Sequence, residues 1–576
     1  MNPLPLLTAL ALAILTGLGG VGSGLAQTSS LVYPGQDGWI ISKPDNLGDR
    51  VPNFSRVGYR YGEEPLPDVP FLVESNRWFI VSPVVGDDQA AIQAAIDQVE
   101  ALATNAYGFR GVVQLTAGNF TISNQLTIRS NGVVLRGVGD GPDSATNTIL
   151  RSTSTNQVEL IEVDAASGSR STVASTTHDI IDKYVPVGAT SFRVDSTANW
   201  SVGDRVLVDR PATTNWVEAL GMDAIPQNSD NSVVQWQSNL TGHVQRYERV
   251  ITRLEGDRVF LDAPIANALE QEFTSATVYR YTFTTRLRQV GIENLRGEAL
   301  FNGSGNENHA WTFINYLRVE DSWIRNITAR NFGFCAVELG TSSTRITVED
   351  CQSLDPQSQI TGGRRYAFNN QGQLNLLWRL FSELGRHDFV NNSPTRGPNV
   401  FYDGLATNQF AESGPHQRWS TGTLYDNLVV RGEALAAYNR GNFGTGHGWS
   451  GANMVYWNSR ADFLRVENPF TAQNWVIGCL GTPQNPGDFL GAPLGTFDST
   501  GTNVTLGDPI HNPAHSLFVG QRYERLLDPT VQLREYALGD FDRFAFDGTN
   551  SVDSVPVDAA WLAAIQPLLG GAPTAR

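Results

Sequence analysis

Short apolar runs alternate with stretches of Asn, Gly and Ser along most of the chain, and the runs return at a nearly constant interval. Val290, Val319 and Val348 each begin a similar short sequence: Val-Gly-Ile-Glu-Asn, Val-Glu-Asp-Ser and Val-Glu-Asp-Cys. They are 29 residues apart, and Leu377 continues the register. A repeat of this length, built from short β-branched runs, is what one coil of a parallel β-helix would produce. The pattern therefore predicts an all-β solenoid.

An amphipathic helix and two glycine-broken strand regions precede these coils. Residues 87–99 begin with two Asp residues and then place apolar residues at helical spacing. Residues 111–122 and 126–139 alternate apolar and polar positions as strands do. The end of a solenoid exposes unpaired backbone groups, so we expect the helix to cover it.

This N-terminal stretch resembles the pectate-lyase-like superfamily of right-handed β-helix proteins. In that superfamily an Asp-Asp-x-x-Ala-Ile-x-x-Ala-Ile helix precedes a Val-x-Leu-x-x-Gly-x-Tyr/Phe-x-Ile coil. The resemblance implies a single-stranded, right-handed parallel β-helix with an N-terminal capping helix. It does not select an activity, because lyases, hydrolases, epimerases and phage spikes share the motif.

The coil pattern is interrupted between residues 178 and 284, where paired runs are typical of hairpin strands in a small inserted β domain. Such a domain could form one wall of a cleft. We therefore divide the chain into a signal peptide (1–26), an N-terminal cap with the first coils (27–177), the inserted β-rich domain (178–284), the main coils (285–510) and a C-terminal cap (511–576).

The first residues predict export. Leu4 to Ile14 form a short apolar run, and Gly24 and Ala26 stand at the small-residue positions that a signal peptidase needs. One departure is that no Lys or Arg precedes Lys43, so the amino terminus supplies the positive charge. The prediction is a secreted or periplasmic protein, and no later stretch is suited to crossing a membrane.

Charge and cysteine content narrow the possible partners. A net charge of −17 argues against a nucleic-acid partner, since binding a phosphate backbone requires a basic face. Cys335, Cys351 and Cys479 are too few for a disulfide framework and fit no zinc motif. We expect them to be buried wall residues, or one bridge with a spare thiol. The sequence leaves the oligomeric state open.

Three histidines follow the repeat. His387, His416 and His447 are 29 and 31 residues apart, so we expect one on each of three successive coils. Neighbouring strands lie about 4.8 Å apart, which makes a ladder roughly 10 Å long, the length of one or two sugar rings. Residues 361–450 also hold eight Arg against six carboxylates, a mildly basic window in an acidic chain.

The last two coils match in more than their histidines. The sequence His416-Gln-Arg418-Trp419 resembles His447-Gly-Trp449 in the next coil. Tyr425 and Tyr456 each follow their histidine by nine residues. Cleavage of a uronic-acid polysaccharide by β-elimination needs a cation for the carboxylate, a base for the C5 proton and an acid for the leaving O4. Arg suits the first task, and His or Tyr suits the others.

We assign the base to His416, the substrate carboxylate to Arg386 and Arg418, and the acid to Tyr425 or His447. His387 is a further catalytic candidate. The remaining substrate-binding candidates are Arg440, Asn439, Asp388, Asp426, and Trp419 and Trp449, whose rings would stack on sugar faces.

Three alternatives use the same region. A glycoside hydrolase would need two carboxylates about 5–10 Å apart, and Asp388, Asp403 and Asp426 are available. Gly446-His447-Gly448 resembles the Gly-His-Gly of polygalacturonases, but the Asn-Thr-Asp, paired Asp and Arg-Ile-Lys motifs of that family are missing there. Three imidazoles could bind a transition metal, although adjacent strands are wide for that. A non-catalytic glycan-binding or structural solenoid is the third.

The sequence thus predicts an exported β-helix enzyme that cleaves an acidic polysaccharide, with β-elimination preferred over hydrolysis. No cofactor is predicted. Calcium, used by some related lyases, would need a carboxylate cluster, which the sequence does not show. The expected partner is the acidic polysaccharide, with no nucleic acid and, in the mature form, no membrane.

Overall fold

The structure is a computed structural model that describes residues 28–35, 40–303, 305–484, 493–499, 504, 506 and 516–526. The predicted signal peptide lies outside the described residues. The predicted C-terminal cap is described only at residues 516–526, which include the helix α4 (Leu517–Leu526).

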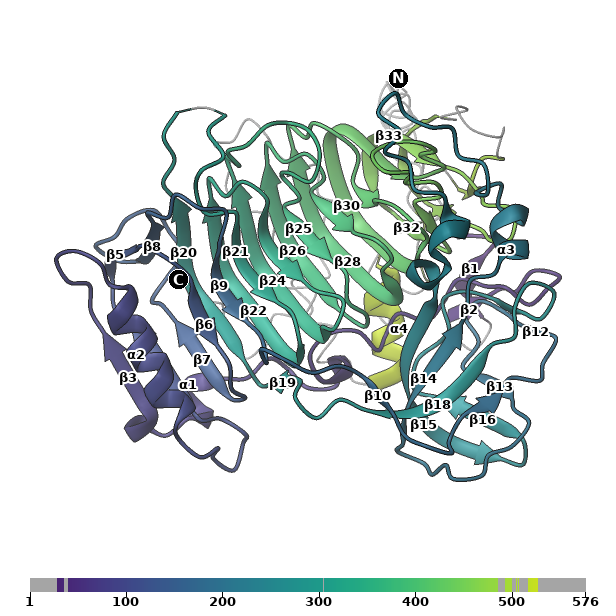
Figure 1. The fold of residues 1–576 in the computed structure, drawn as a ribbon, viewed down its shortest axis with the longest axis horizontal. Coiled ribbons are helices and arrows are strands. Elements are labelled where there is room, and N and C mark those ends of the chain that lie inside the picture. The colour runs from purple at the N-terminus through teal and green to yellow at the C-terminus, as the bar shows by residue number, and fades with distance from the viewer. Residues whose placement is uncertain are drawn as a thin grey trace, which may run out of the picture.

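Two parallel sheets wind around one apolar core (Figure 1). The small sheet contains β6 (Leu126–Ile128), β9 (Glu159–Val163), β21 (Thr312–Tyr316), β23 (Cys335–Leu339), β25 (Phe368–Asn370), β27 (Phe389–Asn391) and β29 (Gly414–Pro415). The large sheet contains β3 (Trp78–Val81), β4 (Gly111–Leu115), β5 (Gly118–Ile122), β7 (Val133–Arg136), β8 (Thr148–Ser152), β19 (Leu287–Arg288), β20 (Gly291–Ala299), β22 (Val319–Arg330), β24 (Thr344–Leu354), β26 (Leu376–Glu383), β28 (Arg396–Thr407), β30 (Ser420–Ala437), β31 (Gly451–Ala452), β32 (Val455–Trp457), β33 (Arg460–Val466), β34 (Trp475–Ile477), β35 (Leu480–Pro483) and β36 (Thr496–Asp498). The chain passes from one sheet to the other in each coil. The predicted right-handed parallel β-helix is confirmed.

The long strands of the large sheet bend at one residue in each coil. Asn294, Asn326, Asp350 and Asn427 stand at this bend with φ of 59°, 52°, 56° and 51°. Asn and Asp adopt this left-handed conformation more readily than most residues. These recurring Asn and Asp residues therefore form the corners at which the chain bends in each coil.

The register differs in part from the predicted one. Val348 pairs with Leu377, as expected, but it pairs on its other side with Ile324, which in turn pairs with Ile292. Val290 and Val319 therefore do not share the phase of Val348. The turns between strands differ in length from coil to coil. A constant step of 29 residues is therefore wrong for the earlier coils and also after Leu377, which pairs with Phe401.

The helix α2 (Gln89–Glu100) closes the N-terminal end of the solenoid, as predicted (Figure 1). Ile92, Ile96 and Val99 on its inner face are fully buried in the core of the coils. The side chain of Asp88 accepts hydrogen bonds from the backbone N–H groups of Val84 and Thr121, which fixes the start of the helix to the strand β5.

The first described residues, 28–35 and 40–77, form an N-terminal strap that crosses the outer side of the large sheet. It contains β1 (Val32–Pro34), β2 (Ile40–Ser42), η1 (Tyr59–Gly62), α1 (Val69–Leu72) and η2 (Ser75–Arg77). Near its start the Ser29 hydroxyl donates to Asp498 of β36, across 469 positions of sequence. Further on, the N–H of Phe54 donates to Gln521 of α4. The strap then leads into β3 of the first coil.

The predicted insertion is an antiparallel β domain beside the later coils (Figure 1). Its main sheet contains β10 (Ser171–Thr172), β11 (His178–Asp179), β13 (Ser191–Arg193), β14 (Arg205–Arg210), β15 (Gln245–Glu255), β16 (Arg258–Leu261) and β18 (Thr277–Thr282), and β12 (Tyr184–Val185) pairs separately with β17 (Leu269–Glu270). The helices α3 (Thr214–Ala219) and η3 (Trp236–His243) lie between β14 and β15. The main sheet starts at residue 171, seven positions before the predicted boundary of 178.

Two further features bear on the sequence predictions. Cys335, Cys351 and Cys479 are buried free thiols, which agrees with wall residues rather than a bridge. Within the residues that the structure describes, none of the helices has the length and apolar character needed to cross a membrane.

Candidate functional site

Three histidine rings and one tyrosine ring stack beside the small sheet. The ring centroids of His387 and His416 are 4.7 Å apart, and those of His416 and His447 are 4.8 Å apart. The ring of Tyr366 lies 5.1 Å from both His387 and His416. The predicted ladder of three histidines on successive coils is confirmed. We call Tyr366, His387, Glu412, His416, Arg440 and His447 the histidine cluster.

The ends of neighbouring strands bring these residues together. Tyr366 precedes β25, His387 precedes β27, and His416 directly follows β29. Arg440 and His447 come from the loop between β30 and β31. Since β25, β27 and β29 are adjacent in the small sheet, residues far apart in sequence meet at one edge.

Both ring nitrogens of His416 have partners. Nη1 of Arg440 lies 2.8 Å from Nδ1 of His416 and also donates to the His416 carbonyl oxygen at 2.8 Å. A guanidinium only donates, so Nδ1 is the acceptor, and the neutral ring then carries its proton on Nε2. Nε2 lies 2.9 Å from the hydroxyl oxygen of Tyr366. The imidazole therefore donates to the tyrosine oxygen.

A buried ion pair fixes the arginine. Nη2 of Arg440 is 3.0 Å from Oε1 of Glu412. The backbone carbonyl oxygen of Glu412 lies 2.6 Å from Nδ1 of His387. Because removing one partner would leave a buried charge uncompensated, Glu412 and Arg440 hold each other in place.

Burial keeps the imidazoles neutral. Burial lowers the pKa of His387 to about 4 and that of His447 to about 3, and it holds the pKa of His416 well below its usual value, with Arg440 acting in the same direction. Burial raises the pKa of the Tyr366 hydroxyl, while the charges of Arg386 and Arg440 oppose that rise. At neutral pH the positive charge of the cluster is therefore that of Arg440 and not of its histidines.

Positive charge exceeds negative charge at this edge. Arg386 and Arg418 are half-buried and flank the cluster, and Glu412 is its carboxylate member. The buried polar atoms there without a hydrogen-bond partner among the described residues include Nε2 of His387, Nε of Arg440 and Nδ1 of His447. Such atoms are rare in folded proteins and often mark a functional site. The arrangement suits an anionic, hydroxyl-rich ligand.

Tyr425 is not part of this site, contrary to the prediction. Its ring is fully buried in the solenoid core, stacked 5.5 Å from Phe401 and 5.0 Å from Tyr456. Its hydroxyl accepts a hydrogen bond from Asn391 at 2.8 Å. A position nine residues after the histidine falls on the inner face of the coil, so Tyr425 has no access to a substrate.

The two tryptophans attach the inserted domain and are not sugar platforms. Trp419 is 1% exposed, its Nε1 donates to Asn267 at 2.7 Å, and its ring meets the edge of Trp216 at 5.1 Å. Trp449 is fully buried, and its Nε1 donates to the carbonyl oxygen of Leu220. The prediction that these rings stack on sugars is wrong in this structure, because the inserted domain covers them.

The three aspartates proposed for hydrolysis lie in three different surroundings. Asp388 accepts a hydrogen bond from Ser382 at 2.6 Å, and burial raises its pKa to about 7. Asp403 stands at the bend of β28 with φ of 56°. Asp426 faces α4, where it accepts from Ser516 and from the N–H of Phe518. Asp403 is close enough to Asp426 to help raise its pKa, and among the described residues neither Asp388 nor Asp426 hydrogen-bonds to a side chain of the histidine cluster.

The surroundings of Asp426 predict a pH effect on stability. Burial raises its pKa to about 8, above the value of about 3.9 expected in the unfolded chain. The folded state therefore holds a proton that the unfolded state has lost, and stability falls as pH rises from about 4 to about 8, by on the order of several kcal/mol. In urea unfolding, we expect Asp426→Asn to gain stability relative to the parent protein over this range while keeping activity; parallel curves would refute the buried neutral carboxyl.

Asn439, directly before Arg440, is a buried residue. The side-chain oxygen Oδ1 of Asn439 accepts from the N–H of Gly441, and its side-chain nitrogen Nδ2 is buried without a partner among the described residues. Tyr366 and Glu412 were missed. Tyr366 precedes His387 by only 21 residues, so the 29-residue interval passes over it, and Glu412 has no counterpart in the next coil.

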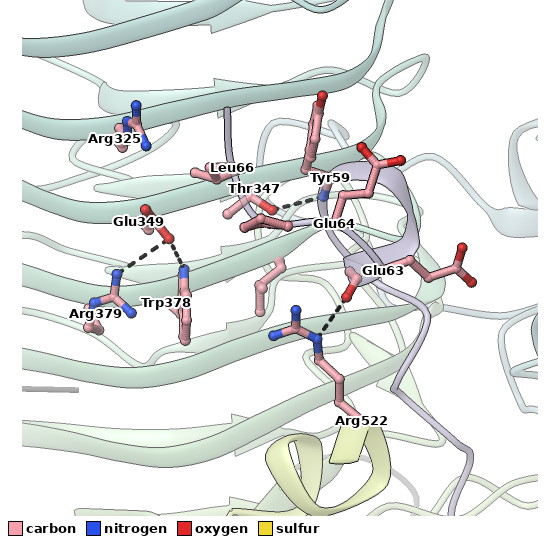
Figure 2. Close-up of a pocket in the computed structure, with 13 residues that line it drawn as sticks. Tyr59, Glu63, Glu64, Leu66, Arg325, Thr347, Glu349, Trp378, Arg379 and Arg522 are labelled. Carbon is pink, nitrogen blue, oxygen red and sulfur yellow. Dashed lines mark hydrogen bonds and ion pairs between the residues drawn. The ribbon is translucent and has the colours of Figure 1, made fainter. Parts of the chain in front are cut away.

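A metal site and a pocket away from the histidine cluster are the two other kinds of site to compare. Among the described residues, no group of three or more His, Cys, Asp or Glu side chains is arranged to hold a metal ion. A pocket of about 280 Å³ lies under the N-terminal strap on the large sheet, lined by Tyr59, Arg325, Glu349, Trp378, Arg379 and Arg522 among others (Figure 2). Glu349 pairs there with Trp378 at 2.8 Å and with Arg379 at 3.3 Å. None of the predicted site residues lines this pocket.

The fold defines the chain as a right-handed parallel β-helix protein, similar in fold to the pectate-lyase-like superfamily. No protein-family model matches the sequence, and no curated protein matches it.

Solved structures with this fold are distant in sequence. The tailspike protein gp49 from Pseudomonas phage LKA1 is 11% identical with a TM-score of 0.37, over 68% of this chain and 56% of that one. The tailspike of E. coli bacteriophage HK620, in complex with a pentasaccharide, is 9% identical with a TM-score of 0.36, over 72% of this chain and 57% of that one. The A-module of the Azotobacter vinelandii mannuronan C-5 epimerase AlgE6 is 10% identical with a TM-score of 0.28, over 69% and 71%. The chain thus spans a little over half of each tailspike.

Proposed function

We propose that this protein is an exported enzyme that cleaves a uronic-acid polysaccharide by β-elimination at the histidine cluster. The observation that carries the proposal is the chain of hydrogen bonds from Arg440 through His416 to Tyr366, set in an excess of arginine. It combines a group able to transfer a proton with cations able to bind a carboxylate.

Tyr366 is the proton-transfer residue in this proposal. Its oxygen receives the Nε2–H of His416, and Arg386 and Arg440 place positive charge near it. Burial raises the pKa of the Tyr366 hydroxyl, and these charges oppose that rise in favour of the phenolate, which is the form that accepts a proton. His416 is a positioning residue here and not the base, because its Nδ1 is occupied by Arg440.

Arg386 and Arg418 bind the substrate carboxylate in this proposal, as the sequence suggested. Both are half-buried at the edge of the cluster, and the Arg418 guanidinium is held by Thr445 at 2.6 Å. Neutralising the carboxylate makes the C5 proton easier to remove. Tyr366, as the phenolate, takes that proton, the C4–O4 bond breaks and a C4–C5 double bond forms. The Tyr366 hydroxyl then gives the proton to the leaving O4, which becomes the new end of the second fragment.

An assay of the mature protein on a panel of uronic-acid polysaccharides tests the proposal. We expect ultraviolet absorbance from the unsaturated product to grow together with new reducing ends. Reducing ends without absorbance would refute elimination and favour hydrolysis. If neither signal grows on any polysaccharide, and circular dichroism shows that the protein is folded, the proposal that it is an enzyme is refuted and a binding protein is favoured.

A further inference from the structure

A row of polar side chains crosses the outer face of the small sheet beside the histidine cluster. Asn315 of β21 pairs in register with Glu338 of β23, and Glu338 pairs with Asn369 of β25. Val337 and Leu339, on either side of Glu338, are buried in the core. Since neighbouring residues of a strand point to opposite faces, the three polar residues point outward. We call Asn315, Glu338 and Asn369 the acceptor row.

The row presents oxygen acceptors. Oε1 of Glu338 accepts from Nδ2 of Asn369 at 3.2 Å and from Nε2 of Gln371 at 2.9 Å, which uses the amide donors. The amide oxygens of Asn315 and Asn369 have no hydrogen-bond partner among the described residues, although the two side chains are only 5% and 0% exposed. Buried acceptors without a donor are costly, and sugar hydroxyls are suitable donors.

The charge of the row differs from that of the cluster. Among the described residues, no Lys or Arg forms an ion pair with Glu338, and burial followed by the neighbouring Glu159 raises its pKa to about 7. The next residue in register, Glu162 of β9, is already paired with Arg129 at 2.6 Å. A second carboxylate placed here would meet acceptors and partial negative charge, with no cation to balance it.

The row also lies close to the cluster. Asn369 is three residues after Tyr366, so the two Cα atoms lie at most roughly 10 Å apart. The strand β23 is next to β25, about 4.8 Å away. A polysaccharide bound at Tyr366 and running toward the N-terminal coils would therefore place a sugar one or two units away on this row.

We propose that the acceptor row binds the hydroxyl groups of an uncharged sugar next to the cleaved uronate. The substrate class is then a heteropolysaccharide in which uronates are separated by neutral sugars, and not a homopolymer of uronate. This inference rests on the proposed function, since it takes the uronate to lie at the histidine cluster.

The test compares kcat/KM of the mature protein on polyuronate homopolymers and on polymers that alternate a uronate with a neutral sugar. We expect the alternating polymers to be preferred. Asn315→Ala should lower kcat/KM on the alternating polymer by about tenfold, the effect of roughly one lost hydrogen bond. Glu338→Arg should raise activity on homopolymers. Glu255→Gln, on an exposed strand of the inserted domain, is the matched control and should change neither.

Equal rates of the parent protein on both polymer classes, unchanged by Glu338→Arg, would overturn the inference and leave the proposed function standing. Calorimetric binding of uncharged and alternating oligosaccharides separates the two ideas without turnover. Binding that Asn315→Ala weakens supports the row even if no polymer is cleaved. If Asn315→Ala is poorly folded, Asn315→Leu, which keeps a similar volume and removes the acceptor oxygen, is used and should weaken binding as well.

Discussion

Tyr366→Phe is expected to lower kcat by about 10²–10⁴, the range over which a positioned proton-transfer group acts. The change removes one oxygen, which accepts the Nε2–H of His416 at 2.9 Å, and leaves the ring between His387 and His416. The folded structure should persist, because leaving the buried Nε2–H of His416 unpaired costs about 1–3 kcal/mol. Steady-state kinetics on the best substrate of the panel, with circular dichroism of the variant, measure the effect.

Tyr425→Phe is the matched control for that experiment. Its hydroxyl lies in the core and accepts from Asn391, so the change leaves a buried donor unpaired and should cost about 1–3 kcal/mol of stability. Its kcat should stay close to that of the parent protein. The opposite result, with Tyr425→Phe inactive and Tyr366→Phe active, would return the proton transfer to the residue that the sequence suggested and remove Tyr366 from the site.

Trp419→Ala is expected to lower the free energy of unfolding by roughly 3–5 kcal/mol, as for other large side chains removed from a core. Trp419 packs among residues of the inserted domain and of the coil and donates to Asn267. The variant should therefore loosen the attachment of the inserted domain, which limited proteolysis detects, and denaturant unfolding gives the free energy.

Phe443→Ala provides the comparison for Trp419. Phe443 is 45% exposed in the loop of the histidine cluster, and its removal should change stability by about 0.5 kcal/mol or less. If Trp419 were a sugar platform, Trp419→Ala would leave stability nearly unchanged and raise KM. That pattern would contradict the packing described above.

The sequence predicts the fold well and the site in part. The solenoid, the capping helix and the insertion follow from local periodicity, which each coil repeats. The histidines of three successive coils do stack, although His387 lies before β27 and His416 follows β29, so the two do not share one phase of the coil. The sequence does not predict which residues of neighbouring coils pair. Ile324 pairs with Val348 because turn lengths vary, so residues at equal spacing need not lie at the same position of the coil.

Side-chain direction is the part that spacing leaves open. Tyr425 keeps a constant distance from its histidine and yet points into the core. Trp419 and Trp449 sit beside the histidines and yet face the inserted domain, whose position over those coils is a tertiary contact that the local sequence does not encode. Tyr366 and Glu412 join the site through packing between coils of unequal length, so no single interval identifies both.

The N-terminal strap changes how this solenoid should lose its structure. In a simple solenoid each coil contacts only its neighbours, so the end coils can fray independently and stability is a sum over adjacent pairs. Here one segment contacts Asp498 at one end, Gln289 among the earlier coils through Tyr59, and then continues into β3 of the first coil. Fraying of either end must break contacts made by the same segment. The strap therefore links the two ends energetically and favours a single cooperative transition for a molecule whose architecture alone would favour stepwise unfolding.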